Sequence, residues 1–250
     1  MSSSTILVTG GTGTLGRPTV AALRDAGHDV RVLSRAAGNG RLVGDLATGA
    51  GLAAALAGVD TVVHLATNAR KDSGQTATLL TAAAAAQVRH LVYISIVGID
   101  DIPFAYYVDK LACERLIERS GIPFTILRAT QFHDFVAKFL RPLRRLPFLI
   151  ALDVSDQPIA VEEVAARLAE LVDAPPAGRV DDIGGPEQKT VRELVDIWQT
   201  AHQTTKPVWM LRLPGKTIRA YQRGHHMTSM PGFGRETFQQ FAERDATAGP

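Results

Sequence analysis

The sequence predicts an α/β protein in which a doubly wound parallel sheet is followed by a smaller C-terminal subdomain. Strand-like and helix-like segments alternate along the first half of the chain, and the strand-like segments are short, continuous apolar runs. A glycine-rich turn also joins the first strand to the first helix. Continuous apolar strands are buried on both faces, and their alternation with helices indicates a parallel sheet that is covered on both sides.

The elements of the first half can be assigned in order from local signals. Gly27 and Gly121 follow helical patterns at the place where a left-handed C-terminal cap residue is expected. The segment Thr76–Ala86 is rich in alanine and leucine, which favour helices. Right-handed crossovers between the strands then give a doubly wound sheet. The predicted strands are 6–9, 30–33, 61–65, 90–94 and 124–127, and the predicted helices are 15–26, 52–56, 76–86 and 109–120.

The regular alternation weakens after Thr130. Helices are predicted at 161–172 and 190–201, and the second begins with the capping box Thr190-Val191-Arg192-Glu193. Residues 180–183 have the composition of a short strand, and no firm pattern follows Lys206. We therefore assign residues 1–130 to one domain. Residues 131–250 form a C-terminal, substrate-side region whose two helices, 161–172 and 190–201, partly complete the first domain.

The segment Phe135–Leu149 is apolar but includes Lys138, Arg141, Arg144 and Arg145. One interpretation is an amphipathic helix that covers the mouth of a site, with its arginine side chains reaching water. The other interpretation is a contact with a partner or with a membrane surface. The pattern favours the first interpretation.

Composition restricts the class of protein. The 250-residue chain is 46% hydrophobic and 21% charged, which is typical of a globular protein, and its formal net charge of +2 favours no nucleic-acid partner. Cys113 is the single cysteine, so no intramolecular disulfide can form. No apolar run reaches the roughly 18 residues of a membrane span, and no signal peptide precedes the first strand. We expect a cytoplasmic protein without membrane association, either a monomer or a homodimer.

The strongest candidate site is the turn Thr9-Gly10-Gly11-Thr12-Gly13-Thr14-Leu15-Gly16. Its glycines at 10, 13 and 16 follow a strand and open a helix, which is the arrangement that binds the diphosphate of a dinucleotide. The first glycine makes the tight turn, the second lets the backbone approach phosphate, and the third lets helix and strand pack closely. Free N–H groups at the helix start favour the anion. Residues 1–130 are therefore predicted to be a dinucleotide-binding Rossmann domain, with Gly10, Thr12, Gly13, Thr14, Leu15 and Gly16 at the cofactor.

The end of the second strand distinguishes the two nicotinamide cofactors. An acidic residue there accepts a hydrogen bond from the ribose 2′-hydroxyl of NAD. This chain has Ser34-Arg35 instead, and a guanidinium offers a planar cationic fork for the 2′-phosphate of NADP. The alternative is that Arg35 is a solvated loop charge. The sequence favours NADP(H) over NAD(H), and no metal is predicted because no cysteine or carboxylate accompanies His225-His226 at ligand spacing.

These motifs resemble the short-chain dehydrogenase/reductase superfamily. The resemblance rests on the glycine turn, Arg35, Gly44-Asp45-Leu46, Leu65-Ala66-Thr67 and Tyr106-x-x-x-Lys110, and it covers roughly residues 5–200. The glycine spacing and the C-terminal appendage are similar to the atypical branch, the NmrA-like or NAD(P)H-binding proteins. The resemblance implies that Asp45 and Leu46 lie beside the adenine ring, that Leu65, Ala66 and Thr67 pass the ribose, that Ala129 and Thr130 border the nicotinamide, and that Gln131, Phe132 and His133 line a substrate pocket.

Tyr106 and Lys110 are the candidate catalytic pair. Their spacing puts both side chains on one face of a helix. A reductase must give a proton to a carbonyl oxygen, and a tyrosine does this well when a nearby ammonium lowers its pKa toward working pH. In the family the lysine also holds the nicotinamide ribose. The resemblance also implies a hydroxyl residue after the fourth strand that orients the substrate carbonyl. Ser95 is the only hydroxyl residue in the segment 94–98 and is the candidate for it, although it lies closer to Tyr106 than the resemblance implies.

Three functions are compatible with this sequence. The first is an NADP(H)-dependent oxidoreductase that transfers hydride to or from a small, fairly apolar carbonyl, quinone or enone. The second is a non-catalytic NADP(H)-binding redox sensor of the NmrA-like type, which the unusual position of Ser95 favours. The third is an isomerase or epimerase that retains its cofactor. The sequence favours the first.

Overall fold

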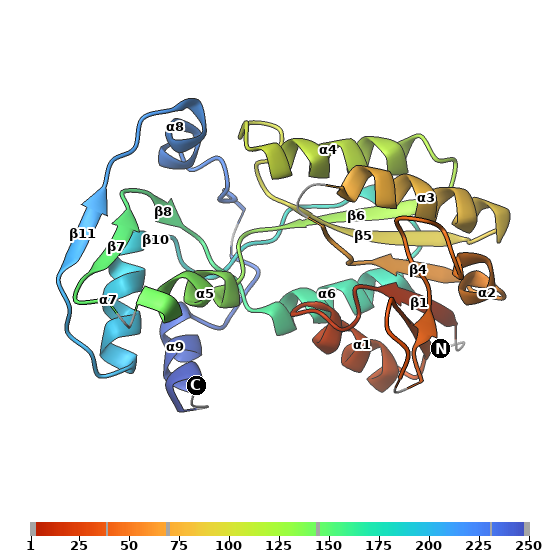
Figure 1. The fold of residues 1–250 in the computed structure, drawn as a ribbon, viewed down its shortest axis with the longest axis horizontal. Helices are drawn as coiled ribbons and strands as arrows, with labels where there is room; N and C mark the ends of the chain where they lie inside the picture. The colour runs from red at the N-terminus through yellow and green to blue at the C-terminus, as the bar shows by residue number, and fades with distance from the viewer. Residues whose placement is uncertain (1–3, 39, 69–70, 144–145, 231, 248–250) are drawn as a thin grey trace. The chain divides into compact units, whose positions relative to one another are not determined.

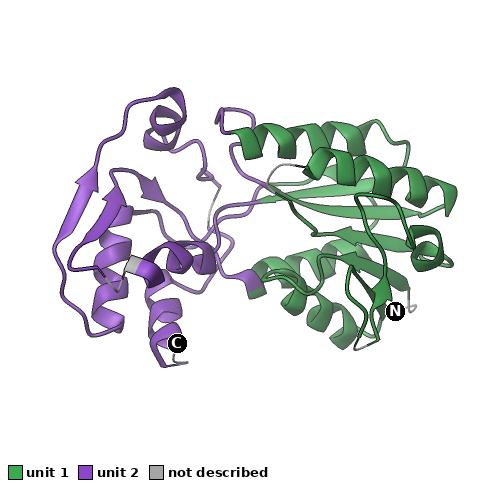
Figure 2. Ribbon diagram, viewed as in Figure 1, with its two compact units in different colours: residues 1–95, 105–128, 162–181 green, residues 96–104, 129–161, 182–250 purple. Residues whose placement is uncertain are grey.

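The computed structural model describes residues 4–38, 40–68, 71–143, 146–230 and 232–247 (Figure 1). Contacts between residues divide the chain into two compact units (Figure 2). Unit 1 comprises Met1–Ser95, Ala105–Arg128 and Glu162–Asp181, and unit 2 comprises Ile96–Phe104, Ala129–Val161 and Asp182–Pro250. Of the two helices expected to complete the first domain, α6 (Val161–Asp173) belongs to unit 1 apart from its first residue, whereas α7 (Val191–Ala201) belongs to unit 2.

Unit 1 is built on a seven-stranded parallel sheet with the strand order β3-β2-β1-β4-β5-β6-β9. The order turns back on itself at β1, so the sheet is doubly wound and the predicted fold class is confirmed. Its central strands are buried along almost their whole length, as their apolar runs predict. The strands are β1 (Thr5–Thr9), β2 (Asp29–Ser34), β3 (Leu42–Val43), β4 (Thr61–His64), β5 (His90–Ile96), β6 (Phe124–Ala129) and β9 (Gly178–Arg179).

Helices cover both faces of this sheet. α3 and α4 lie on one face, and α1 and α6 lie on the other (Figure 1). The first face is filled by a core that includes Leu7, Val62, Leu91, Cys113 and Ile126. Cys113 is fully buried there and packs as a small apolar side chain. The helices are α1 (Gly16–Asp25), α2 (Leu52–Leu56), α3 (Asp72–Ala85), α4 (Ala105–Glu118) and α6.

Two helices begin four residues before their predicted starts. The first turn of α3 is polar, so its propensity is low, but the Asp109 carboxylate in α4 accepts hydrogen bonds from the backbone N–H groups of Asp72 (2.8 Å) and Ser73 (3.4 Å). A carboxylate from a neighbouring helix thus serves the free N–H groups that a local cap would otherwise serve. α4 begins at Ala105, directly after the Pro103-Phe104 pair, and therefore includes both Tyr106 and Lys110.

Unit 2 contains more regular structure than the sequence predicts. The predicted helix over 135–149 is wrong in its extent, since α5 ends at Leu143 and Leu149 begins a strand; Arg144 and Arg145 lie outside the described residues. The predicted strand at 180–183 is also wrong, because only Ile183 forms a bridge, to Ala129. The elements are α5 (His133–Leu143), β7 (Leu149–Leu152), β8 (Ser155–Asp156), β10 (Lys189–Thr190), α7, β11 (Val208–Leu211), α8 (Lys216–Gln222) and α9 (Phe238–Thr247).

The segment after Lys206, which lacks a clear pattern, folds because it meets distant partners. β11 pairs in parallel with β7, which lies more than 50 residues earlier. α9 contributes Phe238 and Phe241 to a core shared with Trp198 of α7. The predicted start of α7 is confirmed, because Thr190 and Glu193 form the reciprocal capping box.

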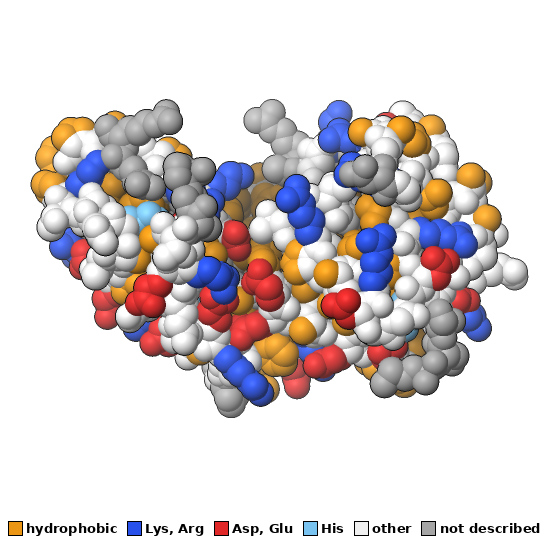
Figure 3. Space-filling model, turned by 90° about the horizontal axis from the view of Figure 1, so that it is seen from below, with side chains coloured by type: hydrophobic (Ala, Val, Ile, Leu, Met, Phe, Trp, Pro, Cys, Tyr) orange, Lys and Arg blue, Asp and Glu red, His pale blue; other side chains and the backbone are white. Residues whose placement is uncertain are grey.

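Lys and Arg side chains are spread among Asp and Glu side chains on the face drawn in Figure 3, as the small net charge suggests. None of the helices in the described part of the chain combines the length and the apolar character that a membrane span requires.

Candidate functional site

The glycine turn after β1 leaves open backbone at the start of α1. Gly10 has a φ of +70°, and a β-carbon there would lie 2.6 Å from the backbone nitrogen of Ala66. The Gly13 N–H donates to the Gly10 carbonyl at 2.9 Å and closes the turn. Leu15, the N-cap residue of α1, makes no side-chain cap, and the first turn of α1 holds no acidic residue. No side-chain cap and no acidic side chain in this first turn therefore competes with an anion at the helix start.

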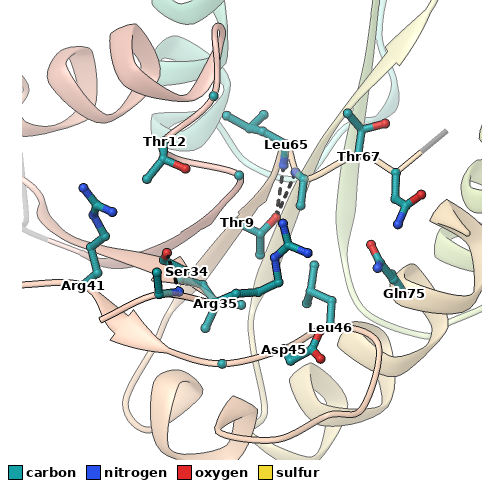
Figure 4. Close-up of a pocket in the computed structure, with 17 residues that line it drawn as sticks. Thr9, Thr12, Ser34, Arg35, Arg41, Asp45, Leu46, Leu65, Thr67 and Gln75 are labelled. Atoms are coloured by element: carbon teal, nitrogen blue, oxygen red, sulfur yellow. Dashed lines mark hydrogen bonds between the residues drawn. The ribbon is translucent and has the colours of Figure 1, made fainter. Parts of the chain in front are cut away.

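A cavity of about 990 Å³ opens beside this turn, at the carboxyl ends of β1, β2 and β4 (Figure 4). Ligands in doubly wound sheets bind at this edge, where the strand order reverses. The lining residues are Thr9, Gly10, Thr12, Gly13, Leu33, Ser34, Arg35, Ala36, Arg41, Gly44, Asp45, Leu46, Leu65, Ala66, Thr67, Asn68 and Gln75.

The cavity brings together most of the residues expected at a cofactor. The turn residues 10, 12 and 13 meet Ser34, Arg35, Asp45, Leu46 and the strand end 65–67. Thr14, Leu15 and Gly16 lie in the same turn but are not among the lining residues. Sequence reasoning missed Arg41, Asn68 and Gln75. Arg41 could have been found from its place just before the very short strand β3, which the sequence analysis also missed.

Two arginines lie at the end of the cavity next to β2. Figure 4 shows Arg35 and Arg41 among its walls, with Ser34 beside them. The Ser34 hydroxyl accepts a hydrogen bond from the Ala36 N–H at 3.2 Å, which shapes the loop after β2. Among the residues that the structure describes, neither guanidinium is paired with a carboxylate, so both positive charges remain available to an anionic ligand.

Thr9 holds the two sides of the cavity together. Its hydroxyl accepts hydrogen bonds from the backbone N–H groups of Leu65 and Ala66, both at 3.2 Å. It also contacts Nδ1 of His64 at 2.7 Å, and the other ring nitrogen contacts Thr76. Burial, helped by the nearby Lys110 charge, lowers the pKa of His64 to about 3, so this histidine is neutral and structural.

Lys110 lies deep in unit 1. Its ammonium donates to the Tyr93 hydroxyl at 3.0 Å and to the Ile94 carbonyl at 3.4 Å, and it lies 3.8 Å from the Asp72 carboxylate. Burial lowers the pKa of Lys110, and the opposite charge of Asp72 works against that shift. The structure thus pairs this lysine with Tyr93 and Asp72.

Tyr106 contacts the cavity wall through Thr67. The two hydroxyl oxygens are 2.9 Å apart, and the Thr67 hydroxyl also donates to Asp72 at 2.7 Å. Burial raises the pKa of Tyr106, and the charge of Asp72 adds to this, while the hydrogen bond with Thr67 opposes it. The expectation that Lys110 lowers the pKa of Tyr106 is therefore wrong for this structure, because the ammonium is turned toward other partners.

Ser95 lies at the end of β5 and is only 3% exposed. Its hydroxyl has no hydrogen-bond partner among the described residues. A buried hydroxyl without a partner carries a free-energy cost, so this one stands out from the satisfied polar groups around it.

The remaining expected residues belong to unit 2. Ala129 and Thr130 are buried, and the Thr130 hydroxyl donates to the carbonyl of Gln157. Phe132 forms a parallel β-bridge with Ile159, in which the Gln131 carbonyl accepts from the Ile159 N–H and the His133 N–H donates to the Ile159 carbonyl. His133 is fully buried between Phe238 and Phe241, and burial lowers its pKa to about 4. His133 therefore packs in the core of unit 2.

Comparison with known proteins agrees with this geometry. Residues 10–175 match the model of a family described as NAD(P)H-binding. A (4-alkanoyl-5-oxo-2,5-dihydrofuran-3-yl)methyl phosphate reductase from Streptomyces griseus subsp. griseus is 33% identical over 97% of this chain and 87% of its own. A photosystem II assembly factor from Trieres chinensis is 25% identical over 91% of this chain and 80% of its own.

A solved structure supports the fold in addition. The crystal structure of an NADPH-dependent quinone oxidoreductase from Escherichia coli, complexed with NADPH, matches with a TM-score of 0.84. The match covers 96% of this chain and 99% of that chain at 18% sequence identity. At that identity the likeness establishes the fold, and the function must be argued from the site.

Proposed function

Because the chain belongs to the NAD(P)H-binding family, we propose that it is a reductase that uses NADPH to reduce a small, fairly apolar carbonyl, quinone or enone. The observation that carries this proposal is the cavity beside the glycine turn. It combines a helix start without a side-chain cap, glycines whose β-carbons would collide with backbone, and two arginines without a carboxylate partner among the described residues. This set fits a dinucleotide that has one more phosphate than NAD.

In this proposal, different residues of the chain bind different parts of the cofactor. The N–H groups at the start of α1 hold the diphosphate, and Arg35 and Arg41 hold the 2′-phosphate, with Ser34 beside them. Asp45 and Leu46 border the adenine, and the strand end at Thr67 borders a ribose. Bound NADPH supplies the hydride.

Tyr106 is the proposed proton donor. Its hydroxyl carries its proton at neutral pH, as a donor must, and burial raises its pKa, which makes it a weaker acid than the sequence pattern predicts. Lys110 holds a positive charge beneath this site, and Ser95 supplies the hydroxyl proposed to orient the substrate carbonyl. The free donor of Ser95, which has no hydrogen-bond partner in the described part of the chain, supports that role.

The Streptomyces relative narrows the substrate class. Its name describes a 5-oxo-2,5-dihydrofuran, in which a carbon–carbon double bond is conjugated with a carbonyl. We therefore expect an enone as the first substrate to try among the three proposed.

The direct test is cofactor binding followed by turnover. Fluorescence titration should show tighter binding of NADPH than of NADH, and oxidation of NADPH should follow when conjugated butenolides, quinones or aldehydes are added. Tyr106→Phe should keep NADPH binding and lose most of the turnover. If the protein binds neither NADPH nor NADH, the proposed cofactor site and the reductase function are both wrong.

A second candidate is a cofactor-binding regulator without turnover. The assembly factor from Trieres chinensis favours it, because its name describes assembly and no reaction. This candidate predicts tight NADPH binding and no oxidation of NADPH with any substrate of the panel. It also predicts that Tyr106→Phe has no measurable consequence.

A further inference from the structure

We propose that Asp72 is a positioning residue that holds Tyr106 through the Thr67 hydroxyl and holds Lys110 through its charge. This inference rests on the function proposed above, since it assigns a role to a residue that serves the same reaction. It adds to the Tyr106–Lys110 pair a carboxylate that neither the sequence pattern nor the cavity lining identifies.

Asp72 is a buried carboxylate with several partners. It is the first residue of α3 and is only 2% exposed. One of its oxygens accepts the Thr67 hydroxyl at 2.7 Å and lies 3.8 Å from the Lys110 ammonium. The other oxygen accepts a hydrogen bond from the backbone N–H of Asn68. Buried charges of this kind persist in proteins only when they are paired and hydrogen-bonded.

The direction of the hydrogen bonds follows from the chemistry of the groups. The Asp72 carboxylate can only accept, so the single proton of the Thr67 hydroxyl is used in that bond. The Thr67 oxygen must then accept from Tyr106, whose hydroxyl lies 2.9 Å away. The Asp72 carboxylate therefore fixes the orientation of the Thr67 hydroxyl. Through Thr67 it also fixes the direction in which the Tyr106 hydroxyl donates its proton.

Among the charged groups that the structure describes near Tyr106, Asp72 is the one that is linked to its hydroxyl by hydrogen bonds. The groups that bear on its hydroxyl are Thr67, Asp72, Asp109 and Cys113. Asp109 uses its carboxylate on the N–H groups at the start of α3, and Cys113 is a buried thiol. Asp72 is joined to Tyr106 by a hydrogen-bonded hydroxyl, whereas the structure gives Asp109 no such link.

A purely structural role for Asp72 makes a different prediction. Its bonds to Thr67 and Asn68 also close the loop that enters α3, and breaking them would loosen that loop. Loosening alone would alter stability, but it would not make the pKa of Tyr106 fall more on loss of the Asp72 charge than on loss of the Asp109 charge. The test therefore measures that ionisation directly.

The experiment follows the four tyrosines by fluorine NMR in protein labelled with 3-fluorotyrosine, with Tyr106→Phe identifying the Tyr106 signal. In Asp72→Asn, loss of the negative charge should lower the pKa of Tyr106 by about 1. Thr67→Val should change this pKa, because the hydroxyl that accepts the Tyr106 proton and links it to Asp72 is lost, and Thr67→Ser should restore the original value. The matched control Asp109→Asn should lower the pKa less than Asp72→Asn does.

Turnover supplies the second measurement. With a substrate of the wild-type protein, Asp72→Asn should reduce kcat by at least about tenfold, a loss of the size that misplaced catalytic groups produce. In the Tyr106→Phe background, Thr67→Val should reduce kcat little further, because both changes act through the Tyr106 hydroxyl.

The two proposals fail in distinguishable ways. Wild-type protein without turnover on any substrate overturns the reductase proposal, and the NMR titration still decides the role of Asp72. An unchanged Tyr106 titration in both Asp72→Asn and Thr67→Val overturns the role of Asp72, even in an active reductase.

Discussion

Gly16 lies directly against the carbonyl of Gly10, so that a β-carbon at Gly16 would sit 2.1 Å from that oxygen. No side chain fits there, because the first turn of α1 packs on the turn that follows β1. The contact explains why glycine is needed at a position that does not itself line the cavity. It also gives the first prediction.

Gly16→Ala should displace the turn and weaken NADPH binding by at least about tenfold, since the backbone N–H groups would no longer converge on one anion. The matched control is Gly74→Ala in α3, where an added β-carbon meets no atom within 4 Å. That change should keep binding and stabilise the protein by about 0.5–1 kcal/mol. Fluorescence titration and urea unfolding measure both, and equal binding by the two variants would contradict the prediction.

Arg35→Ala and Arg41→Ala should each weaken NADPH binding by about tenfold or more, because each removes a charge-assisted hydrogen bond to the 2′-phosphate. NADH binding should stay nearly unchanged, since NADH lacks that phosphate. Arg167→Ala serves as the control, because Arg167 pairs with Glu170 on the surface of α6. Parallel titrations with both nucleotides give the ratio of affinities. A ratio equal to that of wild type in both cavity variants would show that the arginines do not recognise the phosphate.

Breaking the buried pair of Arg128 and Glu114 should destabilise unit 1. Two hydrogen bonds, at 2.8 and 2.6 Å, join these side chains, and each side chain is 3% exposed. Glu114→Gln leaves a buried guanidinium without its counter-charge and should destabilise the protein by about 3 kcal/mol. The exposed Glu170→Gln should cost less than about 1 kcal/mol. Urea unfolding of the two variants tests this, and similar midpoints would refute it.

Asp156 should make unit 2 less stable as the pH rises. Burial raises the pKa of Asp156 to about 6, well above its value in an unfolded chain. The folded state therefore binds the proton more tightly, and the stability that this provides below about pH 4 is lost as the pH rises through about 6. Asp156→Asn removes the titration and keeps the shape of the side chain.

The difference in unfolding free energy between wild type and Asp156→Asn measures this effect. From pH 4.5 to pH 7.5, the unfolding free energy of wild type should fall relative to that of Asp156→Asn. The buried histidines act in the opposite direction in both proteins, because burial lowers the pKa of His64 to about 3 and of His133 to about 4. The effect of these two histidines cancels in the comparison, whereas His226 lies 3.8 Å from Asp156 and titrates together with it. A pH-independent difference would therefore exclude a raised pKa for Asp156 in this pair.

Local signals in the sequence determined the doubly wound sheet, the glycine turn and the start of α7. Each depends on residues that are neighbours in the chain, such as Thr190 and Glu193 in one capping box or Gly10 and Gly13 in one turn. Backbone conformation and periodic burial are properties of a few consecutive residues, so they can be predicted without the tertiary fold.

Only the tertiary structure decided the rest. β7 finds β11 across the chain, Arg41 enters the cavity from a loop without a clear pattern, and α3 begins early because Asp109 accepts its first N–H groups. It also turned Lys110 toward Tyr93 and joined Tyr106 to Asp72 through Thr67. These contacts depend on which distant side chains meet in the interior, and the position of a side chain there is set by packing and by satisfying buried polar groups rather than by spacing in the sequence.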